Sequence, residues 1–240
     1  MIVSLDNMYR SELLFLPARN GNGKLVGLEI ITNFMGVDDG IRTPTGLVLP
    51  RLSEEDEISL FREKLALLET CQIFFIQQQL LAWINISPVI ASALLVQNEL
   101  ASLAQRFPFL ELTVNENFPA LDFVDENHPL ALLAKSFPLV LANFGAGDAS
   151  TRAVFSGLFT RVILDKNFIQ RQAHAASFGP FMRAIVAQAS PYCSAIMAAG
   201  VDDTEILKRL QPWGFTGLFG ALWMAVDVAL LTSLVQSNPA

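Results

Sequence analysis

Short apolar runs that alternate with longer helix-like stretches constrain this chain more than any other feature. The runs lack strict polar alternation, as expected of parallel strands that are buried on both faces. The expected strands are Leu25–Thr32, Leu81–Ile86, Leu110–Val114, Leu139–Ala142, Val162–Leu164, Ala195–Ala198 and Gly217–Phe219. Strands and helices that repeat in this order predict an α/β protein with a parallel sheet.

The number of strand–helix units favours a closed barrel. About seven or eight units in 240 residues fit a single-domain (β/α)8 barrel of the TIM type better than an open doubly wound sheet. No Gly-x-Gly-x-x-Gly stands between the first strand and its helix, which weakens the dinucleotide-binding alternative. The lone Gly145-Ala146-Gly147 is best explained as a turn. No repeat or linker divides residues 1–240, and Gly36–Leu49 is expected to be a surface connection.

Three helix starts can be predicted from capping residues. Ser53, followed by acidic residues, predicts the N-cap of a helix with an apolar stripe through Leu65. Pro88 predicts a helix start that continues through Val89–Ala104. Asp202-Asp203-Thr204 opens the last of the three.

The charge balance excludes one class of partner. The chain has 16 Lys and Arg, 23 Asp and Glu, and a net charge of −7. Such a surface repels phosphate backbones, and no basic run interrupts it, so direct nucleic-acid binding is not expected. Cys71 and Cys193 are far apart and form no metal or disulfide pattern. Because the first residues also lack a signal peptide, a cytoplasmic protein with two structural thiols is predicted.

One segment is apolar enough to suggest a membrane span. Trp213–Val235 is nearly all apolar and has the required length. However, Asp227 lies within it and would be costly in lipid, and several glycines crowd its first half. A final barrel strand, a turn and a packed helix explain the segment better, so no membrane association is expected.

Four segments at the ends of expected strands resemble the motifs of the EAL domain, a bacterial phosphodiesterase that hydrolyses cyclic di-GMP. These segments are Gly27–Ile31, Asn85–Pro88, Ala142–Gly147 and Ile163–Phe168. The resemblance extends from about Leu25 to about Val226 and implies an EAL-type barrel. It also implies a site at the C-terminal ends of the strands, where carboxylates hold two divalent ions and a Lys assists the attacking water.

Five positions keep, or nearly keep, the residue that the resemblance implies. Glu29 matches the signature Glu, Asn85 the metal-binding Asn, and Glu116 a Glu that steadies the neighbouring loop. Asp165 follows the position of the catalytic Lys, and Asp202 replaces a Glu. Each has a plainer explanation. Glu29 could hydrogen-bond to a loop, Asn85 could satisfy backbone groups at the barrel rim, and Asp165 could cap the following helix or pair with a Lys or Arg.

Other positions have lost the residue that the resemblance implies. The substrate-binding Arg, the metal-binding Glu, two adjacent metal-binding Asp, the catalytic Lys, a Glu and a late Gln are replaced by Asn33, Thr113, Ala142 and Asn143, Ile163, Ala199 and Phe219, respectively. Magnesium and manganese need hard, mostly anionic ligands, so catalysis, a metal and a cofactor are predicted to be absent. The apolar Ile163 and Phe219 are expected to fill the barrel mouth.

The two histidines and the acidic loop do not form a competing site. His128 and His174 have no second His or Cys nearby in sequence, which argues against a metal. Asp122, Asp125 and Glu126 are grouped in a loop, where such residues usually form a solvated face.

Within EAL-like proteins, one subgroup matches more closely. Phe74–Gln77, Gly157–Arg161 and Leu164–Gln170 resemble the stand-alone degenerate EAL proteins of enteric bacteria. That resemblance implies binding to FlhD, a subunit of the flagellar activator FlhD–FlhC, and negative regulation of motility. A non-catalytic cyclic di-GMP receptor and a residual phosphodiesterase remain as alternatives. Asn33 and Phe219 argue against nucleotide binding, because phosphate and guanine would lose polar partners.

Overall fold

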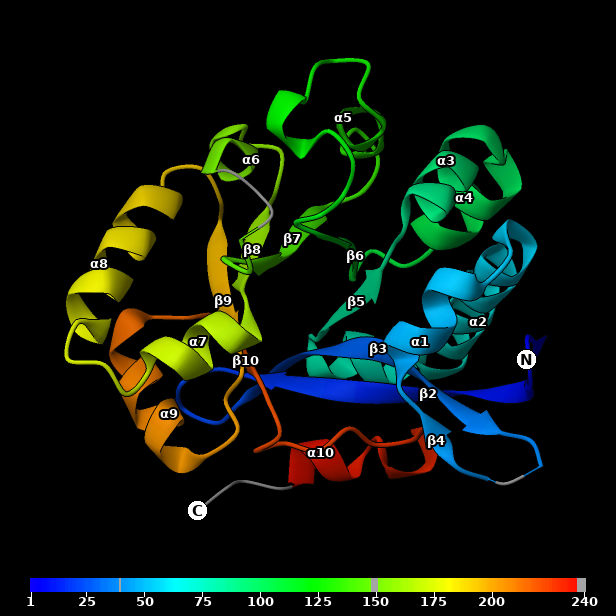
Figure 1. Ribbon diagram of the computed structural model, residues 1–240, viewed down its shortest axis with the longest axis horizontal. Helices are drawn as coiled ribbons and strands as arrows, with labels where there is room; N and C mark the ends of the chain where they lie inside the picture. The colour runs from blue at the N-terminus through cyan, green and yellow to red at the C-terminus, as the bar shows by residue number, and fades with distance from the viewer. Residues whose placement is uncertain (39, 148–150, 237–240) are drawn as a thin grey trace.

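The computed structural model of the protein describes residues 1–38, 40–147 and 151–236. Eight strands form a closed barrel with helices around the outside (Figure 1). In barrel order the strands are β2 (Met8–Arg19), β3 (Leu25–Gly36), β5 (Leu81–Asn85), β6 (Leu110–Asn115), β7 (Leu139–Phe144), β8 (Arg161–Leu164), β9 (Ala195–Ala199) and β10 (Gly217–Phe219). The ring closes because β2 pairs with both β3 and β10. The predicted closed barrel is therefore confirmed.

The strand β2 departs from the predicted alternation of strands and helices. It runs antiparallel to both of its neighbours, whereas the other barrel strands pair in parallel. It joins β3 in a long hairpin, so the first two barrel strands have no helix between them. The short strands β1 (Ile2–Ser4) and β4 (Arg42–Thr43) extend the far ends of β2 and β3.

The helices surround the barrel. They are α1 (Thr45–Val48), α2 (Glu54–Gln78), α3 (Pro88–Val96), α4 (Asn98–Gln105), α5 (Pro129–Leu133), α6 (Thr151–Phe155), α7 (Lys166–Gln172), α8 (Phe178–Ala189), α9 (Thr204–Leu210) and α10 (Ser233–Gln236), with 3-10 turns η1 (Leu49–Arg51), η2 (Leu121–Phe123), η3 (Gln211–Trp213) and η4 (Val228–Leu230). The three predicted helix starts are confirmed, as is the predicted cap Ser53. Ser53, Ser87 and Asp203 each accept a hydrogen bond from a backbone N–H in the first turn of the helix that follows.

Three expectations about connections need correction. The helix from Pro88 does not continue to Ala104, because the extended backbone of Gln97 separates α3 from α4. Gly36–Leu49 is more than a surface connection, since it contains β4 and α1. After β10, the expected turn and packed helix are shortened to a single turn of helix, α10, at the end of the described residues. An irregular segment pairs with β2 through Phe15 and Val226 and ends in the short η4 and α10. Within the described residues, no helix is both long and apolar enough to cross a membrane.

The barrel interior is a separate apolar cluster rather than a water-filled channel. Ala18, Trp83, Val140, Ile163, Met197 and Phe219 are buried there, one from each of six strands. The indole of Trp83 lies over Gly27 of the next strand, where a Cβ atom would approach two ring carbons to 2.3 Å. Glycine at position 27 is therefore required by the size of Trp83, because interiors are packed too densely to absorb such an overlap.

A buried polar chain crosses the barrel beneath this cluster. The indole Nε1 of Trp83 donates to Glu111 Oε2 at 2.8 Å, and Arg161 Nε forms an ion pair with the same oxygen, also at 2.8 Å. Glu111 is only 6% exposed. Its charge is tolerated because a guanidinium and an indole N–H surround it.

Candidate functional site

The C-terminal ends of three adjacent strands place amide side chains at the barrel mouth. Asn85 Nδ2 lies 3.2 Å from the Thr113 carbonyl oxygen and 3.3 Å from its Oγ1. Asn143 Nδ2 donates to Asn115 Oδ1 at 2.8 Å. The prediction that Asn85 satisfies backbone groups at the rim is confirmed. These side chains carry no charge, and they form hydrogen bonds mainly with one another and with Thr113.

The retained Glu116 holds the loop that follows β7. Its Oε2 accepts a hydrogen bond from the backbone N–H of Gly145 at 3.0 Å, and its side chain is buried. Gly145 has a φ of +99°, a conformation that favours glycine. The predicted role of Glu116, steadying the neighbouring loop, is confirmed by this contact.

The signature Glu29 faces a lysine rather than a loop. Within the described part of the chain, Glu29 makes no hydrogen bond or ion pair closer than 4 Å, so the expected hydrogen bond to a loop is wrong. Burial raises the pKa of Glu29, and the charge of Lys64 on α2 opposes that increase. Burial lowers the pKa of Lys64 to about 8, and the charge of Glu29 limits the decrease. The two groups therefore act as a long-range pair in a poorly solvated region.

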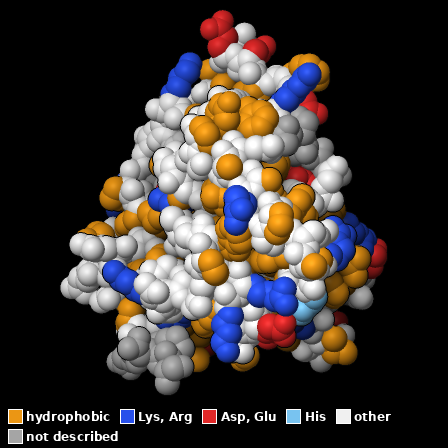
Figure 2. All heavy atoms as spheres, turned by 90° about the vertical axis from the view of Figure 1, so that its left-hand side faces the viewer, with side chains coloured by type: hydrophobic (Ala, Val, Ile, Leu, Met, Phe, Trp, Pro, Cys, Tyr) orange, Lys and Arg blue, Asp and Glu red, His pale blue; other side chains and the backbone are white. Residues whose placement is uncertain are grey.

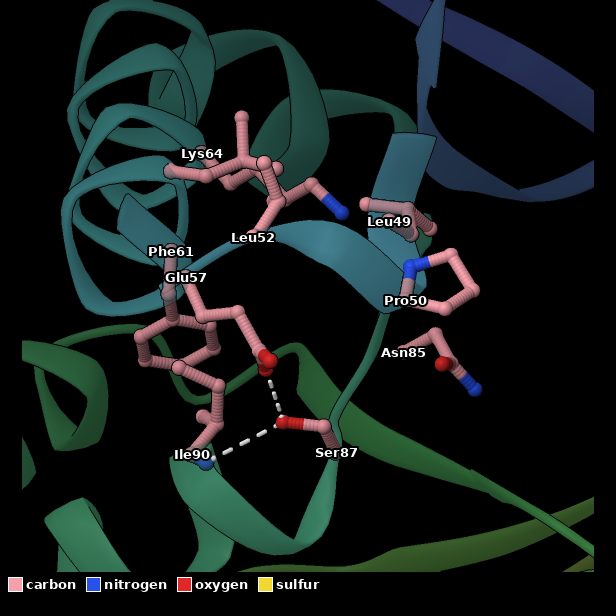
Figure 3. Close-up of a pocket in the computed structure, with 10 residues that line it drawn as sticks. Leu49, Pro50, Leu52, Glu57, Phe61, Lys64, Asn85, Ser87 and Ile90 are labelled. Carbon is pink, nitrogen blue, oxygen red and sulfur yellow. Dashed lines mark hydrogen bonds between the residues drawn. The ribbon is translucent and has the colours of Figure 1, made fainter. Parts of the chain in front are cut away.

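The path by which Lys64 reaches Glu29 follows from the strand register. Pairing between β3 and β5 extends only from Gly27 and Leu81 to Glu29 and Trp83. Beyond that point the two strands separate toward the mouth. Lys64 follows the buried Phe61 of α2 by three residues, so both lie on the same side of that helix. Lys64 lines a cavity of about 290 Å³ that also reaches Asn85 (Figure 3).

Most of the residues that line this cavity are apolar, and the carboxylate of Glu57 in its wall already accepts a hydrogen bond. Figure 3 shows Glu57 directed at Ser87, whose hydroxyl donates to it. The same hydroxyl accepts from the N–H of Ile90 and so caps α3. Lys64 is the one cationic side chain of the cavity, and within the described residues it makes no hydrogen bond or ion pair.

On the opposite side of the mouth, two aspartates have structural partners. Asp165 is buried and accepts from the N–H of Phe168 at 2.7 Å, which confirms the predicted helix cap. The N–H of Ala221, followed by Lys166 and Gln170, holds the pKa of Asp202 below its usual value. Lys166 Nζ lies 3.3 Å from Asp202 Oδ2.

The positions predicted to be apolar replacements lie inside the barrel. Ile163 and Phe219 are 7% and 4% exposed and belong to the interior cluster, with Ala142 and Ala199 packed against it. Ile163 and Phe219 are thus buried within the barrel, and Phe219 also lines the hollow of about 510 Å³ at its mouth.

At the edge of the mouth, Asn33 is buried and accepts a hydrogen bond from Arg42 Nη2 at 2.7 Å. Both residues, together with Lys166, also line the hollow of about 510 Å³. Arg42 therefore places a guanidinium next to Asn33, the position where the resemblance to the EAL domain implies an Arg.

The remaining candidates lie apart from the mouth. His128 caps α5 by accepting from the N–H of Leu130, and its other ring nitrogen lies 3.1 Å from the Pro119 carbonyl oxygen. His174 is near Glu205 on the surface, and the acidic residues 122, 125 and 126 are exposed. No group of three or more His, Cys, Asp or Glu side chains suited to a metal occurs among the described residues.

Sequence reasoning missed Lys64, Arg42 and the Trp83–Glu111–Arg161 chain. One signal was available for Lys64. In α2 the buried residues recur three or four positions apart, at Leu60, Phe61, Leu65 and Leu68, and Lys64 occupies a place in that stripe. A lysine on the apolar side of a helix indicates a buried counter-charge.

Comparison with known proteins agrees with this barrel. The EAL domain family model matches residues 10–225, so the chain belongs to the EAL domain family. Three relatives share nearly the whole length. The "Anti-FlhC(2)FlhD(4) factor YdiV" proteins of Salmonella arizonae and Salmonella typhimurium strain LT2 are 58% and 57% identical, and the "Putative anti-FlhC(2)FlhD(4) factor YdiV" of Escherichia coli K12 is 48% identical. Each alignment covers 98% of this chain and 100% of the relative.

Solved structures show the same fold. The crystal structure of the EAL-like domain protein YdiV has a TM-score of 0.88 and 47% identity, and the match covers 98% of this chain and 100% of that one. The phosphodiesterase PaMucR in complex with c-di-GMP has a TM-score of 0.68 at 20% identity, with 92% and 94% covered. At this identity, the similarity to PaMucR shows a shared fold alone.

Proposed function

We propose that this chain is a non-catalytic EAL-family protein that binds the flagellar activator FlhD–FlhC, through FlhD, and so represses motility. One observation carries the proposal: the chain is 48–58% identical, over 98% of its length, to proteins named as anti-FlhC(2)FlhD(4) factors. At this identity, with both chains covered from end to end, a shared interaction surface is expected along with the fold.

The chemistry of the barrel mouth supports the absence of catalysis. Two divalent ions would bring four positive charges to a mouth whose near groups are amides, a threonine and apolar side chains. The carboxylates near the mouth are already engaged: Glu29 interacts with the charge of Lys64, Asp165 caps α7, and Asp202 pairs with Lys166. This donor set does not fit two Mg²⁺ or Mn²⁺ ions, which require several anionic oxygens. We infer no reaction step at this site.

The acidic charge of the chain supports action on the activator rather than on its promoter. With a net charge of −7, the protein is poorly suited to compete for DNA. Binding to FlhD would instead remove the activator from the promoter.

The test is a co-purification followed by a DNA-binding assay. Tagged wild-type protein should retain FlhD from a mixture of purified FlhD and FlhC, and should reduce promoter binding by FlhD–FlhC. Excess FlhD should relieve the inhibition, whereas excess promoter DNA should not. Failure to form a complex with FlhD at micromolar concentrations, measured by gel filtration, would refute the proposal.

A further inference from the structure

One stretch of the chain has a charge opposite to that of the rest. Residues 151–200 contain five of the 16 Lys and Arg residues but a single one of the 23 Asp and Glu residues. That acid, Asp165, is buried as a helix cap. Consequently α6, α7 and α8, which all lie in this range, present basic and apolar side chains and no exposed carboxylate. The net charge of +4 in this range contrasts with −11 for the remainder.

This stretch also lines an apolar groove. A hollow of about 320 Å³ lies between α6, α7 and α8, and among the described residues that line it Gln188 is the one with a polar side chain. Phe155 and Phe181 line it while 41% and 42% exposed. Figure 2 shows the side of the molecule that carries α8, where hydrophobic side chains are grouped in the upper part, with Lys and Arg on either side of them.

The groove has a fixed aromatic wall. The rings of Phe168 and Phe181 contact each other with centroids 5.3 Å apart, which joins α7 to α8. Gly145, held by Glu116, lies against the ring of Phe168. Because both helices and the loop are anchored, the groove is preformed, and filling it requires little ordering.

Two basic side chains beside the groove are available to a partner. Arg171 follows Phe168 by three residues, which places it on the adjacent part of the α7 surface. Arg183 is exposed on α8. Among the described residues, neither arginine makes an ion pair or a hydrogen bond.

We propose that the groove between α6, α7 and α8 is the docking surface for the activator, and that it receives an acidic, amphipathic helical segment of that partner. The proposal rests on the proposed function and adds the surface and its chemistry. An apolar helix face would fill the groove around Phe181, and flanking carboxylates would reach Arg171 and Arg183. Charge complementarity selects this occupant. A nucleic acid would meet the acidic remainder of the chain, and an uncharged helix would leave both arginines unused.

The test compares variants of the full-length protein in binding purified FlhD–FlhC, with affinity measured by calorimetry. Phe181→Glu places a charge in the groove, and Arg171→Glu with Arg183→Glu reverses the charge beside it. Ile76→Glu and Lys24→Glu are matched controls, because both residues are exposed on other parts of the surface. Circular dichroism checks folding, and Phe181→Ala serves if Phe181→Glu does not fold.

Both groove variants should bind at least roughly tenfold more weakly than wild type, and the controls should bind as wild type does. Raising the salt concentration should weaken wild-type binding more steeply than that of the double arginine variant. If the wild-type protein binds the activator and every groove variant binds it equally well, the proposed docking surface is refuted but the proposed function is not. Wild-type protein that does not bind overturns the proposed function as well. The protein could instead form a homodimer that Phe181→Glu dissociates while activator binding is unchanged. That result would assign the groove to a second copy of the chain and overturn the proposal.

Discussion

The indole of Trp83 meets the ring of Phe219 edge-on inside the barrel, with centroids 5.5 Å apart. Both side chains are almost fully buried, and they come from strands that are not neighbours in the sheet. The contact therefore ties opposite parts of the barrel wall together through its interior.

Removing this contact should be costly. Phe219→Ala is expected to lower the free energy of unfolding by about 3–5 kcal/mol, because it deletes a buried ring and leaves a cavity beside Trp83. Urea unfolding at neutral pH measures the change. Phe123→Ala is the matched control, since Phe123 is 75% exposed and its loss should cost less than about 1 kcal/mol. Equal losses at the two positions would contradict the interior role of Phe219.

The purified protein should not hydrolyse cyclic di-GMP in Mg²⁺ or Mn²⁺. Thr113, Ala142 and Asn143 supply no carboxylate at the mouth, and Ile163 supplies no amine. Ile163→Lys should not produce activity, because the ions would still lack ligands, and it should lower stability by burying a charge. The measurement is chromatographic detection of the linear product. Turnover above a buffer blank that Glu29→Ala abolishes would refute this prediction.

Cyclic di-GMP itself should bind weakly or not at all, in the millimolar range, where binding is worth about 4 kcal/mol. Phe219 occupies part of the mouth, and Asn33 replaces a charged group with an amide. Arg42 and Lys166 both favour an anion there, but Lys166 already pairs with Asp202, so Arg42→Ala is the informative variant. Calorimetry that finds a low-micromolar site, lost in Arg42→Ala, would support the receptor alternative.

Lys64 should make stability depend on pH above neutrality. Its pKa is about 8 in the folded protein, below the usual value of 10.5, so the unfolded chain binds the proton more tightly between these values. Stability rises with pH wherever the unfolded state binds more protons. The ammonium therefore costs stability below about pH 8, and this cost disappears as the pH rises toward 10.5.

The measurement is the difference in unfolding free energy between wild type and Lys64→Gln at pH 7 and pH 10. Wild type should gain relative to the variant by on the order of 1–3 kcal/mol over this range, since one pKa unit corresponds to about 1.4 kcal/mol. Lys24→Gln provides the control, because Lys24 is exposed. A difference that does not change with pH would show that Lys64 is not buried as described.

The buried carboxylate of Glu111 should matter far more than an exposed one in a similarly short ion pair. Glu111→Gln leaves Arg161 without a counter-charge and is expected to cost about 3 kcal/mol or more. Glu69→Gln breaks the pair with Arg106, which is 2.7 Å long, against 2.8 Å for Arg161–Glu111, but about half exposed on both sides, and should cost less than about 1 kcal/mol. Thermal unfolding of the two variants in parallel would detect the difference, and similar melting temperatures would contradict it.

Sequence patterns predicted the parallel part of the barrel well because its strands are short, apolar and bounded by helix caps. They failed for β2, whose sequence Met8–Arg19 mixes polar and apolar residues and whose pairing is antiparallel on both sides. An antiparallel strand that closes a parallel barrel has no local signature, because it is defined by its two distant partners.

At the mouth, the contacts of Asn85 and Asp165 followed from residue type and position along a strand, and that of Glu116 followed from the resemblance to the EAL domain. The partner of Glu29 did not, because Lys64 is distant in sequence and reaches it only where β3 and β5 separate. The surface groove likewise depends on how α6, α7 and α8 meet. Interactions between elements, rather than within them, account for what sequence reasoning left out.

The packed interior also makes the present state of this barrel hard to reverse by single mutations. Restoring a charged group at position 163 or 142 alone would place an unpaired charge within or against the interior cluster that contains Trp83, Met197 and Phe219, with no ion yet bound to compensate it. Either first step would reduce stability before any later step could gain from a metal. Descendants of this chain are thus expected to vary on the outer helices while the interior stays apolar.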